Sequence, residues 1–291
     1  MINANPIQLE KSIKILAGLL LFLWLPFSFY ARNQEQPYPN IVIILADDMG
    51  YGDLTCYNSE SKIPTPNMDE VANAGLRFTD AHSPAAVCTP SRYGLLTGRY
   101  CWRTRLKRRV LNGYDPLLVD TSRTTIASYL KKKGYTTACI GKWHLGLGYR
   151  DSTDFYSKIS PGPIELGFDY FYGISGSLNM RPFCFIRNHY TDGYLSVEKS
   201  PYNYPQQKGM MVPGWRDEQV DVAFVEEASR FIAEHRKQPF FVYLALSAPH
   251  TPHVQPYFIK NKSDAGPRGD MVLEVDWAVG QIRKNLERFN L

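Results

Sequence analysis

The sequence lacks a strong charge of either sign, and none of its cysteines is spaced for metal binding. The formal net charge is only +5 at pH 7 over 291 residues, which does not by itself argue for a nucleic-acid partner. It is compatible with an anionic small substrate or a glycan. No two of the five cysteines form a CxxC pair, and there are no internal repeats. With 44% hydrophobic and 21% charged residues, the composition is that of an ordinary globular protein.

Residues 1–31 are predicted to be a signal peptide or an N-terminal anchor. Lys11 and Lys14 precede an apolar run over 15–25, which is shorter than the roughly 20 residues of a membrane-spanning helix. No cysteine follows the run, which argues against a bacterial lipoprotein. We expect a linker over 32–38 and one domain over 39–291, which is partial at its C-terminal end. The protein is then secreted, periplasmic or otherwise exported, or alternatively attached to a membrane through this segment alone.

The odd number of cysteines leaves their pairing open. Export allows disulfides, but at least one of the five thiols must stay unpaired or have another fate. If Cys88 is that one, the other four could pair in three ways. Buried free thiols are an equally good interpretation for Cys56 and Cys139. The remaining two are Cys101 and Cys184.

Strand-like and helix-like segments alternate along the chain. Continuous apolar runs predict strands over 41–46, 135–140 and 240–246, the first as a central strand buried on both faces. Helices are expected at the following ranges: 65–76, 92–97, 124–133, 219–236 and 270–289. Residues 150–214 are rich in Tyr, Pro, Gly and Ser, so we expect loops and short edge elements that line a cleft. This order predicts an α/β layered fold with a largely parallel sheet.

Polar clusters follow the three predicted strands. They are Asp47-Asp48, Gly141-Lys142-Trp143-His144 and Pro249-His250. Ligands of open α/β sheets bind at the carboxyl ends of the strands, so these residues are expected to converge. Two adjacent carboxylates at a buried strand end repel each other, and a divalent cation such as Ca²⁺ or Mg²⁺ relieves that cost. A helix cap or a solvated turn is the alternative for the acid pair.

Cys88 precedes a predicted helix, where a thiolate is stabilised and can act as a nucleophile. A structural thiol is the alternative. Lys142 and His144 occupy alternate positions after a strand and are expected to point the same way, unless they are simply a surface pair. His250 directly follows a strand end, so we prefer it to the nearby His253; an ordinary loop histidine is the alternative.

The segment Cys88-Thr89-Pro90-Ser91-Arg92, followed by Leu-Leu-Thr-Gly-Arg over 95–99, resembles the signature of type I, formylglycine-dependent sulfatases. These are arylsulfatase-like members of the alkaline-phosphatase superfamily. Segments 39–50, 65–69, 141–146 and 247–252 resemble further family segments in the family's order. The resemblance extends from Pro39 to the end of the chain. It implies an alkaline-phosphatase-like sandwich, with a mostly parallel central sheet flanked by helices.

The resemblance also implies a cleavage mechanism for sulfate esters of aryl or carbohydrate substrates. A separate formylglycine-generating or sulfatase-maturating enzyme oxidises Cys88 to formylglycine. One hydroxyl of the aldehyde hydrate attacks sulfur, and the other later collapses to expel sulfate. Asp47, Asp48 and residue 88 bind the metal, Ca²⁺ rather than Mg²⁺. In the implied mechanism, Arg92 binds the hydrate and Lys142 binds sulfate. His144 removes the proton that drives sulfate release, and His250 binds sulfate and protonates the leaving group.

The chain also departs from the family pattern. In the family, a later strand carries an Asp-Asn pair that completes the metal site, and this sequence stops at Leu291 without it. We therefore expect a fold that is incomplete at its C-terminus and a chain that hydrolyses sulfate esters weakly or not at all by itself. The alternatives are a phosphatase or phosphonate hydrolase of the same superfamily, and a truncated pseudoenzyme. The basic run over 99–109 is either a solvated face or a contact for a sulfated glycan.

Overall fold

A six-stranded sheet, with the strand order β1-β8-β2-β3-β4-β5, forms the centre of the described structure. Four strands are parallel: β1 (Ile41–Leu45), β8 (Phe240–Ala245), β2 (Thr136–Lys142) and β3 (Tyr170–Ile174). The antiparallel edge consists of β4 (Ile186–Arg187) and β5 (Tyr190–Thr191). A separate hairpin pairs β6 (Val197–Lys199) with β7 (Gly209–Met211). The prediction of a mostly parallel α/β sheet is confirmed.

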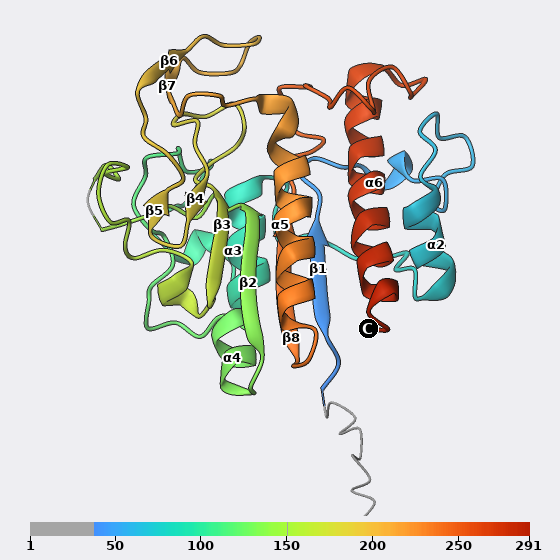
Figure 1. Cartoon of the computed structure of the whole chain (residues 1–291), viewed down its shortest axis with the longest axis horizontal. Helices are drawn as coiled ribbons and strands as arrows, with labels where there is room; N and C mark the ends of the chain where they lie inside the picture. The colour runs from blue at the N-terminus through green and yellow to red at the C-terminus, as the bar shows by residue number, and fades with distance from the viewer. Residues whose placement is uncertain (1–37, 150) are drawn as a thin grey trace, which may run out of the picture. The chain divides into compact units, whose positions relative to one another are not determined.

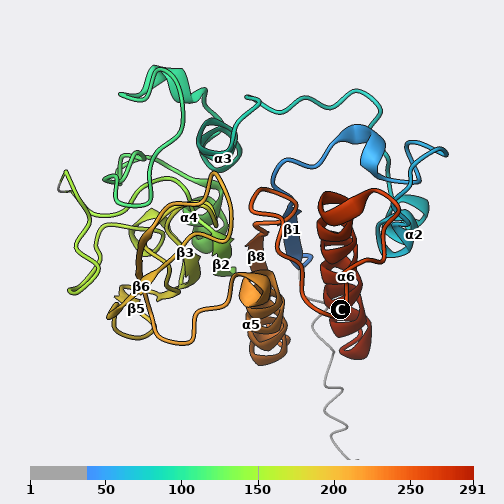
Figure 2. The ribbon, with the colours of Figure 1, turned by 90° about the horizontal axis from the view of Figure 1, so that it is seen from above.

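Helices cover both faces of this sheet (Figures 1 and 2). One face carries α5 (Val220–His235) and α6 (Gly266–Arg288), with α2 (Pro66–Ala74) outside α6. The other face carries α3 (Cys88–Thr97) and α4 (Ile126–Lys132). Short 3-10 helices lie at Tyr51–Asp53, Cys101–Arg103, Ile164–Leu166 and Asp217–Gln219. This arrangement is a three-layer sandwich.

The computed structural model describes residues 38–149 and 151–291. The predicted signal peptide or anchor, and all of the predicted linker except Tyr38, lie outside them. Residues 38–291 form one compact unit. No helix in the described ranges is both long and apolar enough to cross a membrane.

Each face of β8 contributes to a different hydrophobic core. Val242 and Leu244 pack with Phe224 of α5 on one side of the sheet. Phe241 and Tyr243 pack with Leu96 of α3 on the other side. Successive side chains of a strand point to opposite faces, so a continuous apolar run is what burial on both faces requires. β8 meets that requirement, because all six of its residues are buried.

The interpretation of two other segments was wrong. β1 lies at one end of the strand order, and its five residues are only partly buried, so it is not a central strand in the described structure. β3 belongs to the 150–214 region that we interpreted as loops and edge elements, yet it pairs with β2 and is almost entirely buried. The Tyr and Gly residues of β3 resemble those of the surrounding loops, so composition did not identify this strand, which is defined mainly by its pairing with β2.

All five cysteines are free thiols in the structure, so the disulfide pairings left open by the sequence are not formed. Cys101, Cys139 and Cys184 are buried, whereas Cys56 and Cys88 are partly exposed. Burial raises the pKa of the Cys184 thiol to about 12, so this thiol stays protonated and unreactive at neutral pH. Cys139 fits the interpretation as a buried free thiol.

The register of the parallel strands aligns their carboxyl ends. Leu45 of β1 pairs with Ala245 of β8, which in turn pairs with Gly141 of β2. Gly141 has φ +118°, and a Cβ at this position would lie 1.9 Å from the carbonyl oxygen of Ala245. Only glycine tolerates this combination of close approach and positive φ. The polar residues that follow all three strands therefore emerge at the same edge of the sheet.

Candidate active site

Asp47 is the centre of a buried charge cluster at this edge. Its backbone N–H donates to the carbonyl of Ala248 at 3.0 Å, which ties the end of β1 to the end of β8. Its Oδ2 accepts from the Lys142 ammonium and lies 3.3 Å from Nη2 of Arg92. All three side chains are almost completely buried. Residues from β1, β2 and α3 thus meet at a single carboxylate.

The charges in this cluster hold Asp47 in its ionised form. Burial by itself raises the pKa of this carboxyl, but Lys142 and Arg92 together outweigh burial and lower the pKa below its usual value. Burial lowers the pKa of Lys142, and the charge of Asp47 opposes that effect. A buried charge is costly without a partner, so the three groups depend on one another.

Arg92 also bonds to the chain beyond Asp47. Its Nη1 donates to the Lys142 carbonyl, while its Nε is buried without a hydrogen-bond partner among the described residues. Since Arg92 lies one helical turn after Cys88, the helix fixes the guanidinium next to the start of α3. A buried donor without a partner is a group that a bound oxyanion or a modified side chain would satisfy.

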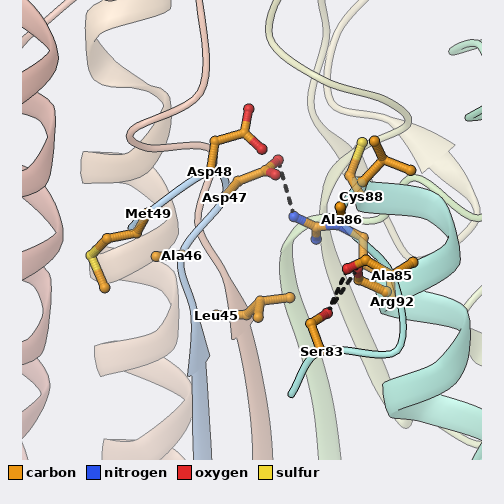
Figure 3. Close-up of a pocket in the computed structure, with 12 residues that line it drawn as sticks. Leu45, Ala46, Asp47, Asp48, Met49, Ser83, Ala85, Ala86, Cys88 and Arg92 are labelled. Atoms are coloured by element: carbon orange, nitrogen blue, oxygen red, sulfur yellow. Dashed lines mark hydrogen bonds and ion pairs between the residues drawn. The ribbon is translucent and has the colours of Figure 1, made fainter. Parts of the chain in front are cut away.

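Cys88 and the acid pair border the same pocket, whose volume is about 320 Å³ (Figure 3). Asp47 and Asp48 lie on one side, and Cys88 and Arg92 lie on the α3 side. Cys88 is the first residue of α3, so the helix starts four residues earlier than predicted. The first backbone N–H groups of a helix lack intrahelical partners and favour negative charge nearby. Residue 88 therefore lies where the start of the helix favours a negatively charged group.

Asp48 and His250 approach each other above the buried cluster. Asp48 adopts a left-handed backbone with φ 68°, and its side chain is 57% exposed. Its carboxylate Oδ2 lies 3.7 Å from Nε2 of His250. Nδ1 of His250 donates to the Thr251 carbonyl at 2.6 Å, which fixes the ring so that Nε2 faces Asp48. Burial, followed by the charge of Lys142, lowers the pKa of His250.

His144 lies beyond the end of β2, so strand alternation does not by itself set the direction of its side chain relative to Lys142. β2 ends at Lys142, and His144 has φ 55°, so the two residues do not share a strand face. The ring is fully buried and Nε2 donates to the Leu111 carbonyl at 2.7 Å. Burial and the charge of Lys142 hold its pKa well below the usual value, so the imidazole is neutral. None of Lys142, His144 and His250 lines the 320 Å³ pocket.

Sequence reasoning missed two hydroxyl groups that hold His144. The Thr89 hydroxyl donates to the His144 carbonyl at 2.9 Å and accepts from the Leu111 N–H at 3.2 Å. Ser177 Oγ lies 3.4 Å from Nδ1 of His144, the nitrogen that carries the lone pair in this tautomer. Thr89 lies inside the cysteine motif, where its burial was not recognisable, and Ser177 is separated from His144 by 33 residues.

Two further residues fix the loops of the site. Asp221, buried at the start of α5, accepts from the backbone N–H groups of Ser247 and Ala248 at 2.8 and 2.7 Å. These bonds position the turn that leads to His250. Arg268 of α6 donates to the Asp48 carbonyl at 3.0 Å and pairs with Asp53 at 2.7 Å. The sequence does not indicate these roles of Asp221 and Arg268, because the order of polar residues along α5 and α6 is not distinctive.

The donor chemistry around the pocket fits part of a calcium site. Asp47 and Asp48 are hard oxygen donors next to each other, as Ca²⁺ requires, but Ca²⁺ takes six to eight oxygens. Among residues 38–149 and 151–291, no group of three or more His, Cys, Asp or Glu side chains is arranged to hold a metal. Asp47 Oδ2 is also engaged by Lys142 and Arg92. These residues would therefore supply only some of the ligands.

A layered fold with its polar site at the carboxyl edge of a parallel sheet defines an alkaline-phosphatase-like α/β protein. The Sulfatase family model matches residues 39–290, so the chain belongs to the sulfatase family. It is 34% identical over 296 residues to the N-acetylgalactosamine-6-O-sulfatase of Bacteroides thetaiotaomicron, covering 89% of this chain and 58% of that protein. It is 36% identical over 268 residues to human arylsulfatase A, covering 84% and 48% respectively.

A solved structure agrees with this assignment. A Bacteroides thetaiotaomicron protein, whose structure was described in connection with the metabolism of multiple glycosaminoglycans, aligns with a TM-score of 0.79 and 33% identity. The alignment covers 87% of this chain and 60% of that one. The chain therefore spans about half the length of the curated relatives it matches.

Proposed function

We propose that this protein hydrolyses sulfate esters at the pocket between Asp47 and Cys88. The observation that supports this most strongly is the shared pocket, in which the start of α3 brings Cys88 and Arg92 opposite the acid pair. Membership in the sulfatase family favours sulfate over phosphate or phosphonate as the reacting group. The alternatives of a phosphatase and an inactive fragment have no comparable support among the relatives described above.

In this proposal, a separate maturating enzyme converts Cys88 to formylglycine. The hydrated aldehyde would supply one hydroxyl as the nucleophile and a second whose proton loss releases sulfate. Arg92, with its unsatisfied Nε, binds oxygen atoms at position 88. Its contacts with Asp47 and the Lys142 carbonyl keep the guanidinium from rotating away.

The remaining basic groups have separate roles: Lys142 supplies positive charge, and His144 and His250 transfer protons. Lys142 provides a fixed positive charge close to Asp47, which favours a bound tetrahedral anion. The neutral His144 keeps a lone pair at Nδ1 and accepts a proton through the Ser177 side, rather than directly in the pocket. Because Nδ1–H of His250 donates to the Thr251 carbonyl, Nε2 next to Asp48 carries the lone pair in the neutral ring. Nε2 first takes up a proton from solvent, and the resulting imidazolium, facing the Asp48 carboxylate, gives that proton to the leaving oxygen.

We assign Asp47 and Asp48 as ligands of a calcium ion, which would polarise the sulfate oxygens when bound. Their hard oxygen donors suit Ca²⁺ better than a softer metal, and Mg²⁺ is the second choice because it demands a stricter octahedral geometry. Residue 88 would add one further oxygen ligand to this partial set once it carries oxygen in place of sulfur.

We further propose a sulfated carbohydrate as the substrate. Similarity to a protein named N-acetylgalactosamine-6-O-sulfatase and to a structure described for glycosaminoglycan metabolism supports this class. Similarity to arylsulfatase A keeps small aryl sulfates as convenient probes.

Two measurements test the proposal. A mass spectrum of the peptide that contains Cys88, from a host with a maturating enzyme, should show replacement of the thiol by an aldehyde. The matured protein should release sulfate from an aryl sulfate faster than phosphate from the matching aryl phosphate, and Cys88→Ala should abolish both. Undiminished sulfate release by a protein whose Cys88 is unmodified, or a preference for the phosphate ester, would contradict the proposed formylglycine-dependent hydrolysis of sulfate esters.

A further inference from the structure

Four arginines surround a second pocket at the end of α3 that lies away from Cys88. Its volume is about 260 Å³, and its lining includes Arg99, Arg103, Arg105, Arg123 and Asp120. α3 has ten residues, so its two ends are about 15 Å apart at 1.5 Å per residue. No residue that lines the pocket at Cys88 also lines this one. The two pockets are therefore separate sites along one helix.

The positive charge of this arginine pocket is not neutralised from within. Arg105 donates to the carbonyls of Pro116 and Leu117 at 2.6 and 2.9 Å, which places its fork against the backbone. In the described part of the chain, Arg99, Arg103 and Arg123 form no ion pair with a carboxylate, and Arg123 Nε is buried without a hydrogen-bond partner.

Asp120 offsets only one of these four positive charges. Its Oδ1 already accepts from the N–H and hydroxyl of Ser122 at 2.9 and 2.8 Å. The lining of this small pocket therefore holds four arginines and one carboxylate. Such groups repel one another unless an external anion binds, and the planar guanidinium fork matches the oxygens of sulfate.

Two exposed aromatic rings lie next to the arginine pocket. Tyr100 and Trp102 are 54% and 57% exposed, and their rings stack with centroids 5.9 Å apart at an interplanar angle of 18°. The guanidinium carbon of Arg103 lies 5.6 Å from the Trp102 ring, so the aromatic surface and the charge are contiguous. A wide, exposed ring has an apolar face on which the C–H groups of a sugar can pack.

We propose that Arg99, Arg103, Arg123 and Trp102 form a second, non-catalytic subsite that binds a sulfate group and an adjoining sugar of a multiply sulfated polysaccharide. This inference rests on the proposed function only for the choice of a sulfated carbohydrate as ligand. The subsite holds the polymer away from Cys88 while a different sulfate group occupies the pocket at Cys88. It therefore favours substrates long enough to reach both ends of α3.

The test measures binding in a Cys88→Ala background, so that it does not depend on maturation or turnover. Isothermal titration with chondroitin sulfate chains is compared between this variant and one that also carries Arg103→Gln and Arg123→Gln. Losing two charge-assisted contacts should weaken binding at least about tenfold. Arg108→Gln is the matched control, because it removes the same charge from an exposed residue that does not line the pocket. It should weaken binding less than about threefold per charge.

Further arms identify the ligand and guard against misfolding. Arg103→Gln alone, at an exposed residue, should weaken binding if the double variant fails to fold. Trp102→Ala should weaken binding of the polysaccharide and leave binding of inorganic sulfate unchanged. Equal losses for Arg108→Gln and Arg103→Gln, or no loss for either, would overturn the proposal. So would full competition by inorganic sulfate at the same sulfate concentration, or equal arginine-dependent binding of single-stranded RNA.

Discussion

Nη2 of Arg92 lies 3.3 Å from Oδ2 of Asp47, and both side chains are buried although 45 residues separate them in the sequence. This contact joins α3, which carries Cys88, to the end of β1, which carries the acid pair. The geometry of the site therefore depends on a buried ion pair that also includes Lys142.

We expect Arg92→Ala to destabilise the chain by about 3–5 kcal/mol, because it leaves a buried carboxylate with one partner fewer. Arg92→Lys keeps the charge but loses the planar fork that reaches both Asp47 and the Lys142 carbonyl, so it should be only a partial replacement. Urea unfolding measures both effects. Arg216→Lys, at an exposed ion pair with Glu218, is the control and should change stability by less than about 0.5 kcal/mol. A cost below about 1 kcal/mol for Arg92→Ala would contradict this account.

The Thr89 hydroxyl should contribute more to folding stability than the Thr89 methyl group. Thr89→Val leaves the His144 carbonyl and the Leu111 N–H without their partner, at an expected cost of about 1–3 kcal/mol. Thr89→Ser keeps the hydroxyl and should recover most of that loss. The comparison is made by thermal or urea unfolding, with Thr121→Val at an exposed position as the control. If the serine variant is as unstable as the valine variant, packing of the methyl group is the cause instead.

Asp221 should make stability fall as pH rises from about 4 to about 6. Burial raises the pKa of this carboxyl to about 6 from its ordinary value of 3.8, although two backbone N–H groups oppose the rise. Between these two pKa values the folded state retains a proton that the unfolded chain has released. The contribution of Asp221 to folding stability is therefore complete below the unfolded-state pKa and lost above the folded-state pKa. The difference corresponds to about 3 kcal/mol, since one pKa unit is about 1.4 kcal/mol.

Asp221→Asn removes this titration while keeping one acceptor oxygen. Unfolding free energies at pH 4 and pH 7 should therefore show that the wild type loses more stability than the variant between the two values. Glu274 has a pKa raised by burial and by Asp221, and it leaves a residual slope in the same direction in both proteins. Asp264→Asn, at an exposed residue, should behave like the wild type. Parallel pH profiles for wild type and Asp221→Asn would refute the prediction.

Calcium binding should depend on Asp48 more simply than on Asp47. Asp48→Asn removes an exposed carboxylate that lies 3.7 Å from Nε2 of His250, so it should weaken Ca²⁺ binding at least about tenfold without a large change in stability. Asp47→Asn should both weaken binding and destabilise the fold, because Lys142 and Arg92 lose their counter-ion. Calorimetric titration with CaCl₂ and unfolding curves separate the two effects. Unchanged Ca²⁺ affinity in Asp48→Asn would show that the acid pair is not the metal site.

Much of the fold could be predicted because burial on both faces of a parallel sheet leaves a continuous apolar run. Phe240–Ala245 is such a run, and it lies inside the sheet between β1 and β2. Tyr170–Ile174 was missed because its composition resembles that of the loops around it, and only pairing with β2 makes it a strand. Ile41–Leu45 reads as a central strand but lies at the edge, since composition does not report how many neighbours a strand has.

The sequence by itself determined which chemically active residue types are present and next to which strands, because the motif at Cys88 and the polar residues after each strand are local features of the chain. Tertiary structure decided which of those residues meet. The left-handed turn at His144 directs its ring to Leu111 and Ser177, and the strand register brings Lys142 to Asp47. Such contacts join residues 33 to 95 positions apart, and their geometry depends on packing between elements, which no local pattern encodes.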